Sequence, residues 1–130
     1  MLLLDTHVLL WLALEPERIP KNWNDAMEEA RRTTGSLAIA GSTLWEIAQL
    51  DAKGRLLLDP PVDVFLERVE KIYRVFPINR QIAVRGSQFS ATYPRDPADR
   101  QIGATAIIHG LTLVTADQRI LSSGEVPCLW

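Results

Sequence analysis

The chain has 130 residues, 47% of them hydrophobic and 23% charged, and a formal net charge of −2. This composition excludes a disordered segment, and the length suits one domain over residues 1–130 that folds without a disulfide or a structural metal. The slight negative charge also disfavours a protein that coats nucleic acid, which would usually be basic.

Short apolar runs mark the predicted strands. The unbroken run Leu2–Leu4 is typical of a strand that is buried on both faces. Pro77 places the third strand at the edge of its sheet, because proline cannot donate to a central ladder. We expect five strands, at residues 2–4, 37–40, 75–78, 111–115 and 126–129.

Periodic apolar residues and capping residues mark the helices between these strands. Thr6 can cap the first helix, Ser42 or Thr43 the third, and Asn79 the fifth. Gly110 suits the end of the sixth. We expect helices at residues 8–14, 22–32, 43–50, 62–73, 80–89 and 97–109, with a brief helical turn at 120–121.

The alternation of strands and helices predicts an α/β protein with a parallel sheet covered by helices on both faces. In such sheets the working site lies beyond the carboxyl ends of the strands. Asp5 and Asp117 follow predicted strands directly or within two residues. This rule makes both of them candidates for the site, although a helix cap at Asp5 and an Asx-turn at Asp117 are the alternatives.

Two further acids open the predicted helix 97–109. Asp96 suits the cap, where an acid is favoured by the helix dipole. On a helical wheel Asp99 aligns with Ile102 and Gly103, on the small and apolar side of the helix. We therefore expect Asp99 to face the end of the sheet, and Asp96 mainly to start the helix.

Glu46 has two interpretations. Thr43 and Glu46 fit a capping box, in which the glutamate bonds back to the start of its helix. Glu46 also shares a narrow polar sector with Gln49, flanked by Trp45 and Leu50, so its carboxylate could face a half-buried cleft.

Together the acids predict a metal site. Carboxylates gathered in one pocket repel each other, and a hard divalent cation removes that penalty. Ligation by oxygen alone suits Mg²⁺ or Mn²⁺ and not zinc. Such a site can hydrolyse a phosphodiester by activating a water molecule. The candidate catalytic and metal-binding residues are Asp5, Glu46, Asp99 and Asp117, with Asp96 as an additional candidate ligand.

Other polar residues have weaker claims. Arg95, Arg100 and Arg119 lie close to the acids in sequence and are candidates for contacts with substrate phosphates, with solvated charge as the alternative. Arg80, Arg85, Lys53 and Arg55 are more distant candidates with weaker support. For His7 we favour a hydrogen-bonded core residue over a neighbour of the site. His109 precedes Gly110 at a helix end, where the helix dipole explains it.

The single cysteine and the N-terminal sequence limit the setting. A lone thiol, Cys128, forms neither an internal disulfide nor a cysteine-rich zinc site, which favours the cytoplasm. The run Leu2–Leu4 is not interpreted as a signal peptide, because no basic region precedes it and Asp5 interrupts it. No stretch approaches the ~20 apolar residues that span a bilayer, so we expect no membrane partner.

Four segments carry a family resemblance: LLDTHVLLW at 3–11, LWEI at 44–47, RDPADR at 95–100 and TLVTAD at 112–117. Together, and in this order, they resemble the PIN-domain toxins of the VapC type over essentially the whole chain. The resemblance implies a compact three-layer α/β/α sandwich. It also implies an endoribonuclease dependent on Mg²⁺ or Mn²⁺, the toxin of a type II toxin–antitoxin pair.

The resemblance also assigns residues and partners. The acids of the family map onto Asp5, Glu46, Asp99 and Asp117, and Thr6 and Thr115 match hydroxyl positions that support the site. The implied partners are an RNA substrate, a second copy of the chain and a small cognate antitoxin that blocks the acidic cleft.

Two other functions remain to be weighed against the ribonuclease. A non-catalytic module of the same fold would bind RNA or protein, and the intact set of acids argues against it. A phosphoacceptor receiver domain needs a lysine after a late strand, whereas this chain has Ala116-Asp117-Gln118-Arg119 there.

Overall fold

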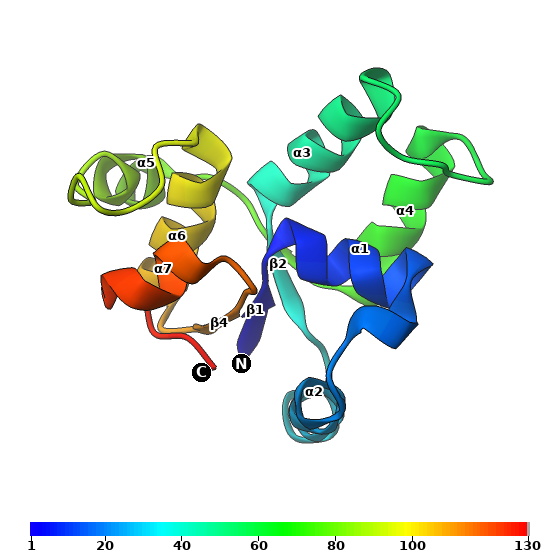
Figure 1. Ribbon diagram of the computed structural model, residues 1–130, viewed down its shortest axis with the longest axis horizontal. Coiled ribbons are helices and arrows are strands. Elements are labelled where there is room, and N and C mark those ends of the chain that lie inside the picture. Colours follow the sequence, from blue (N-terminus) through cyan, green and yellow to red (C-terminus); the bar gives the residue numbers. More distant parts are fainter. Residues whose placement is uncertain (130) are drawn as a thin grey trace.

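The computed structural model describes residues 1–129 and has three layers, with helices packed on both faces of a parallel sheet (Figure 1). The sheet has four strands in the order β3-β2-β1-β4. The three-layer α/β/α architecture predicted from the sequence is therefore confirmed. The strands are β1 (Leu2–Leu4), β2 (Ala38–Ala40), β3 (Arg74–Phe76) and β4 (Thr112–Val114).

The helices form the two outer layers (Figure 1). One face of the sheet packs on α1, α2, α3 and α4 through a core that contains Met27, Ile47 and Phe65. The other face packs on α5, α6 and α7 through a second core that contains Ile82 and Ile102. The helices are α1 (Thr6–Leu14), a 3₁₀ turn η1 (Pro16–Arg18), α2 (Lys21–Thr34), α3 (Gly41–Ala52), α4 (Val62–Ile72), α5 (Arg80–Gly86), α6 (Pro97–His109) and α7 (Gln118–Ser123).

The strand β1 belongs to both cores. Leu2 and Leu4 pack in the first core and Leu3 in the second, as the alternation of side chains along a strand requires. Leu3 and Leu4 are completely buried. Burial on both faces explains why this strand has no polar residue, and it fixes the position of Asp5 directly after the strand.

The prediction of a fifth strand at residues 126–129 is wrong. The segment 126–129 makes only an isolated parallel bridge, between Leu113 and Cys128. The Leu113 N–H donates to Pro127 O at 2.8 Å, and the Leu129 N–H donates to Leu113 O at 2.9 Å. Pro127 has no N–H of its own with which to extend the ladder, so the pairing stays short.

The element boundaries confirm most of the predicted helices and correct two of their starts. Asp5 caps α1 by accepting from the Thr6 N–H, and Thr6 is the first residue of the helix. The helix α3 begins at Gly41 without a side-chain cap, so the predicted cap at Ser42 or Thr43 is wrong. The capping box between Thr43 and Glu46, one of the two interpretations of Glu46, does not form either. The strand β3 is at the edge of the sheet, as predicted from Pro77, but it ends at Phe76, so Pro77 follows the strand and does not lie within it.

None of the described helices is long and apolar enough to cross a membrane. The apolar stripe of α2 faces the protein, since Trp23 and Met27 are buried in the first core.

Gly103 lies in α6 where the second core is tightest. A Cβ atom at this position would meet the Tyr93 hydroxyl group at less than van der Waals distance and the Phe89 Cζ atom at 3.0 Å. These two rings are stacked, with centroids 3.9 Å apart. The absence of a side chain therefore allows the loop before α6 to pack directly on that helix.

We predict that Gly103→Ala lowers the free energy of unfolding by about 1–3 kcal/mol through overpacking, although alanine is the better helix former by about 1 kcal/mol. Urea denaturation measures the change. In Gly103→Ala/Tyr93→Phe the loss should be smaller than the sum of the two single losses, because the nearest clashing atom is gone. A Gly103→Ala variant more stable than the wild type would contradict the prediction.

Candidate active site

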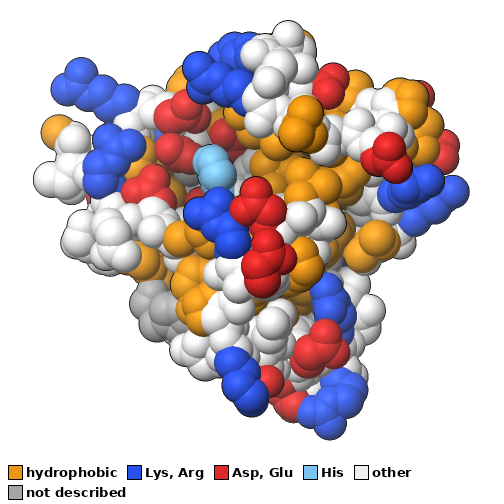
Figure 2. Space-filling model, turned by 45° about the vertical axis from the view of Figure 1, so that its right-hand side comes forward, with side chains coloured by type: hydrophobic (Ala, Val, Ile, Leu, Met, Phe, Trp, Pro, Cys, Tyr) orange, Lys and Arg blue, Asp and Glu red, His pale blue; other side chains and the backbone are white. Residues whose placement is uncertain are grey.

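A cavity of about 440 Å³ opens beyond the carboxyl ends of β1 and β4. Figure 2 shows acidic side chains gathered around a hollow on this face, with a histidine beside them and basic side chains nearby. The cavity is lined by Asp5, His7, Trp11, Glu46, Asp96, Asp99, Ala116 and Asp117. All five acids named from the sequence therefore line one cavity.

Asp5 is the most deeply held of these acids, with only 6% of its surface exposed. Its Oδ1 atom accepts from the Thr6 N–H at 2.8 Å. Its Oδ2 atom accepts from the Thr115 hydroxyl group at 2.6 Å. The residue is thus the cap of α1 and a member of the cavity at once, and both of its oxygens are held in place.

Glu46 reaches the cavity from α3 and is held by threonines. The Thr6 hydroxyl group donates to Glu46 Oε1 at 2.5 Å. The same hydroxyl oxygen lies 3.0 Å from Thr43 Oγ1. Because the one proton of Thr6 goes to Glu46, Thr43 is the donor in this second bond. The chain Thr43–Thr6–Glu46 orients a carboxylate that a capping box would have turned away.

Asp96 and Asp99 enter the cavity from the start of α6. Asp96 Oδ1 accepts from the Ala98 N–H at 2.8 Å and the Asp99 N–H at 3.3 Å, as the predicted cap. Asp99 does not cap the helix. Its backbone carbonyl accepts from the Tyr93 hydroxyl group at 3.1 Å, which ties the first turn of α6 to the preceding loop.

Asp117 begins α7, and its Oδ1 atom accepts from the Arg119 N–H at 2.9 Å. Its own N–H donates to Thr115 Oγ1 at 3.1 Å. Thr115 therefore accepts from Asp117 and donates to Asp5, so one buried hydroxyl group connects the acids that follow β4 and β1.

Burial and mutual repulsion raise the pKa values of three acids. The pKa of Asp99 rises to about 7, mainly because its carboxylate is desolvated and then because Asp5, Asp96, Glu46 and Asp117 lie near it. Burial also raises the pKa of Asp5, and the hydrogen bond from Thr115 offsets part of that rise. Burial also raises the pKa of Glu46, and the hydrogen bond from Thr6 lowers it in part.

The donor set fits a hard divalent cation. One oxygen from each of Glu46, Asp96 and Asp99 lies within 4.8 Å of the others, and carboxylates are the ligands that Mg²⁺ and Mn²⁺ prefer. Asp96 belongs to this compact set although the sequence pointed to it mainly as a cap. One of its oxygens caps α6, and the other remains available.

The arginines named from the sequence differ in their surroundings. Arg100 binds the loop before α6: its guanidinium donates to the carbonyl oxygens of Pro94 at 3.0 Å, Ser90 at 3.3 Å and Phe89 at 3.4 Å. This arrangement explains Arg100 as a structural residue. Arg95 and Arg119 are exposed, and neither of them lines the cavity.

Two residues of α1 line the cavity although the sequence did not assign them to it. His7 is exposed, so its interpretation as a core residue was wrong. Trp11 lies four residues later, on the same face of α1, and the Arg18 guanidinium lies 4.5 Å from the centroid of its ring. The spacing of four residues was the signal that could have placed both beside Asp5.

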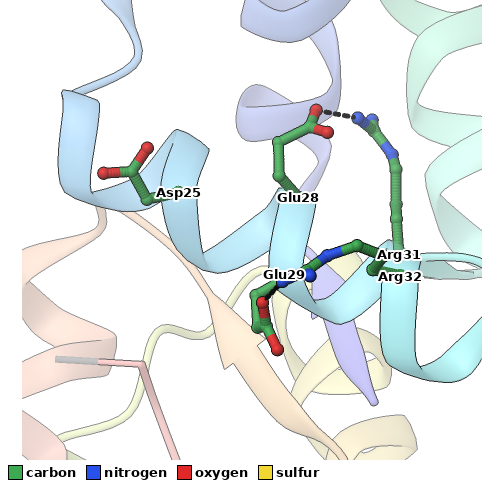
Figure 3. Close-up of a pocket in the computed structure, with 5 residues that line it drawn as sticks. All are labelled: Asp25, Glu28, Glu29, Arg31 and Arg32. Atoms are coloured by element: carbon green, nitrogen blue, oxygen red, sulfur yellow. Dashed lines mark hydrogen bonds and ion pairs between the residues drawn. The ribbon is translucent and has the colours of Figure 1, made fainter.

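A second charged hollow, on α2, does not compete with this site. Its lining residues are Asp25, Glu28, Glu29, Arg31 and Arg32. Figure 3 shows that Glu28 pairs with Arg31, at 2.9 Å, and Glu29 with Arg32. These are surface pairs three residues apart, whose charges are mutually neutralised, and they leave no set of acids for a cation.

Comparison with known proteins identifies the fold and its family. The family model described as the PIN domain matches residues 2–124. The chain belongs to the PIN-domain family. It is 38% identical over 120 residues to ribonuclease VapC22 of Mycobacterium tuberculosis, which covers 92% of this chain and 89% of that protein. It is therefore a homologue of a VapC ribonuclease.

Solved structures agree with this assignment. FitAcB from Neisseria gonorrhoeae is 25% identical, with a TM-score of 0.65 over 98% of this chain and 96% of that one. DNA-bound VapBC from Salmonella typhimurium is 20% identical, with a TM-score of 0.72 over 98% of this chain and 95% of that one. At this level of identity the comparison supports a shared fold and nothing more.

We predict that the metal-free protein loses stability as the pH rises. The pKa of Asp99 rises from 3.8 to about 7 on folding, so between these values the folded state binds more protons than the unfolded state. The free energy of unfolding therefore falls as the pH increases through this window. Thermal melts in EDTA, from about pH 5 to about pH 8, measure the trend.

The matched control is an exposed acid outside the cavity. Asp99→Asn should flatten the pH dependence and raise the melting temperature at the alkaline end, whereas Asp59→Asn should leave the curve unchanged. A metal-free protein that gains stability towards about pH 8 would contradict the repulsion between the acids.

Proposed function

We propose that this PIN-domain protein is the toxin of a type II toxin–antitoxin pair and that it hydrolyses RNA phosphodiesters as a metal-dependent endoribonuclease. The observation that carries this proposal is the cavity. Acids from the starts of α1, α6 and α7, together with Glu46 of α3, line it, in a chain homologous to a VapC ribonuclease. The complete set of acids speaks against a module that only binds RNA or protein.

The metal-binding and catalytic residues in this proposal are Asp5, Glu46, Asp99 and Asp117, with Asp96 as a further ligand. When bound, Mg²⁺ or Mn²⁺ would polarise a phosphoryl oxygen and lower the pKa of a water molecule. The compact set of Glu46, Asp96 and Asp99 supports a place for the cation. Asp5 and Asp117 complete the negative wall around it.

Thr6 and Thr115 are positioning residues in this proposal. The hydroxyl group of Thr6 holds Glu46, and that of Thr115 holds Asp5. Both bonds favour the charged form of the carboxylate that accepts them. These residues therefore oppose the effect of burial and keep two of the acids ready to bind a cation.

We further propose a small antitoxin and a second copy of the chain as partners, with RNA as the substrate in the cytoplasm. Exposed apolar side chains provide surface for such contacts: Leu57 is 95% exposed, Trp45 60% and Ile78 48%. Trp23 is buried, so α2 offers less apolar surface for such contacts.

We predict that purified protein free of antitoxin cleaves RNA with Mg²⁺ or Mn²⁺ and that EDTA stops it. Asp5→Asn and Asp99→Asn should reduce cleavage to background, because each removes a charge from the cavity. Circular dichroism and thermal melts should show that both variants remain folded. Full activity in both would overturn the assignment.

Thr115 offers a finer test of the positioning role. Thr115→Val keeps the shape of the side chain and removes the hydroxyl group that donates to Asp5. Loss of such a supporting hydrogen bond typically costs on the order of 10- to 100-fold in activity or metal affinity. Thr115→Ser, which keeps the hydroxyl group, should retain most of the activity. Equal loss in both variants would show that packing, and not the hydrogen bond, matters.

We predict that Mg²⁺ or Mn²⁺ stabilises the protein by removing the repulsion between acids. A ligand at 100 times its Kd adds about 2.7 kcal/mol to the free energy of unfolding. Differential scanning calorimetry at neutral pH, against NaCl of equal ionic strength, measures the shift. Asp99→Asn should lose most of it and Asp59→Asn none, while a melting temperature indifferent to the cation would count against a metal site.

A further inference from the structure

Another hollow, distinct from the one on α2 and about 270 Å³ in volume, adjoins the acidic cavity. It lies between α3 and the start of α6. We call it the α3–α6 groove. It shares Glu46 and Asp96 with the cavity, so the two hollows lie side by side. The other side chains that matter here are Trp45, Gln49, Lys53 and Arg55. In contrast to the cavity, which none of the described lysines and arginines lines, this groove is lined by two cationic side chains together with an aromatic ring.

The sequence of α3 places these side chains together. Trp45 and Gln49 are four residues apart on one side of α3. Lys53, another four residues on, is the C-cap residue directly after the helix. Gly54 then adopts a positive φ of 70°. This turn lets the Arg55 N–H donate back to Leu50 O at 2.9 Å. The chain thus folds back at the helix end and brings Arg55 to the same groove as Lys53.

Neither Lys53 nor Arg55 has a competing side-chain partner among the described residues. Among residues 1–129, no ion pair or side-chain hydrogen bond involves either side chain. Two other basic residues near the acids are engaged: Arg18 stacks on Trp11 and pairs with Glu15 at 3.2 Å, and Arg100 binds loop carbonyls. Arg95 and Arg119 are exposed but line neither the cavity nor the groove, whereas Lys53 and Arg55 line the groove.

A polyanionic substrate needs such charge. A cation bound at the acids would offset charge on the phosphate group that reacts, but the chain has a net charge of −2, which repels the neighbouring phosphates. Lys53 and Arg55 can offset that repulsion one step away from the acids, where they share a wall with Glu46 and Asp96.

Trp45 adds a surface for a base. Its side chain is 60% exposed beside the groove. An exposed indole next to cations is the combination that single-stranded nucleic acid binds, because bases stack on the ring while the phosphates meet the charges. Sequence tolerance follows, since every base has a face that can stack.

We propose that the α3–α6 groove binds the nucleotide of a single-stranded RNA next to the bond that is cleaved, with its phosphate on Lys53 and Arg55 and its base against Trp45. This inference rests on the proposed ribonuclease function for the identity of the ligand. In this proposal the groove aligns the RNA strand, and the acids of the cavity carry out the cleavage.

The first test measures binding, in an Asp99→Asn background that keeps the RNA intact. The probe is a short fluorescent single-stranded RNA of mixed sequence. The double variant Lys53→Gln/Arg55→Gln should bind at least about fivefold more weakly, and the slope of log K against log salt should decrease by about 1.4 for two lost phosphate contacts.

The control Arg68→Gln/Lys71→Gln removes the same charge from α4, where neither side chain lines the cavity or the groove. It should change affinity by less than about twofold. Equal losses in the two double variants, or an unchanged salt slope, would overturn the proposal by showing only a general effect of net charge. Because this assay needs no cleavage, its failure is distinguishable from failure of the ribonuclease assignment.

The second test concerns the ring. Trp45→Ala should weaken RNA binding by at least about fivefold, and Trp45→Phe should retain most of the affinity, because it keeps a stacking surface. Cleavage by the corresponding variants with an intact Asp99 should show a higher KM with little change in kcat.

Self-association is the competing use of the same side chain, since Trp45 also lines a hollow with Ile78. Light scattering of wild type and Trp45→Ala separates the two uses. If Trp45→Ala shifts the protein to a smaller species while the RNA affinity per protomer is unchanged, Trp45 is a protein contact and the proposal is wrong. Weaker RNA binding at unchanged molecular mass supports it.

Discussion

The acidic cavity depends on the convergence of helix starts at one edge of a parallel sheet. The carboxyl ends of β1 and β4 lie side by side, and α1 and α7 begin directly beyond them. The first amides of each helix need acceptors, which Asp5 and Asp117 provide. Capping therefore concentrates negative charge at this edge, and the same residues that start helices form the wall of a site.

This convergence costs free energy, because buried carboxylates lose solvation and repel one another. Asp99 has no cap to make, and its pKa rises to about 7 because it is desolvated among four other acids. Strain of this kind is typical of functional sites, where local stability is given up for chemistry. The two extensive apolar cores on either side of the sheet provide the stability that makes such a cluster tolerable.

Much of the fold could be predicted from the sequence because its apolar periods are strong and its breakers are well placed. Strands at Leu2–Leu4 and Thr112–Val114 and the helix after Asp96 follow from local chemistry alone. The fifth strand could not be excluded in this way, since the pairing partner of residues 126–129 is fixed by tertiary contacts and shortened by Pro127.

The candidate site was predictable in its acids but not in its supporting contacts. Capping and ligation had been treated as competing explanations, whereas Asp5 and Asp96 cap helices and line the cavity at the same time. The sequence around Glu46 fits a capping box, but in the structure its carboxylate accepts a long-range hydrogen bond from Thr6 instead. His7 was misjudged because sequence gives no measure of which side of a buried helix opens to solvent.

Thr6 connects parts of the site that are otherwise far apart in the chain. Its N–H holds Asp5, and its hydroxyl group holds Glu46 while accepting from Thr43. The orientations of two acids are therefore not independent variables. Substitutions at Asp5 and Glu46 should be non-additive, in the manner of residues that act as one unit. A substitution at Thr6 would therefore disturb the orientations of Asp5 and Glu46 together.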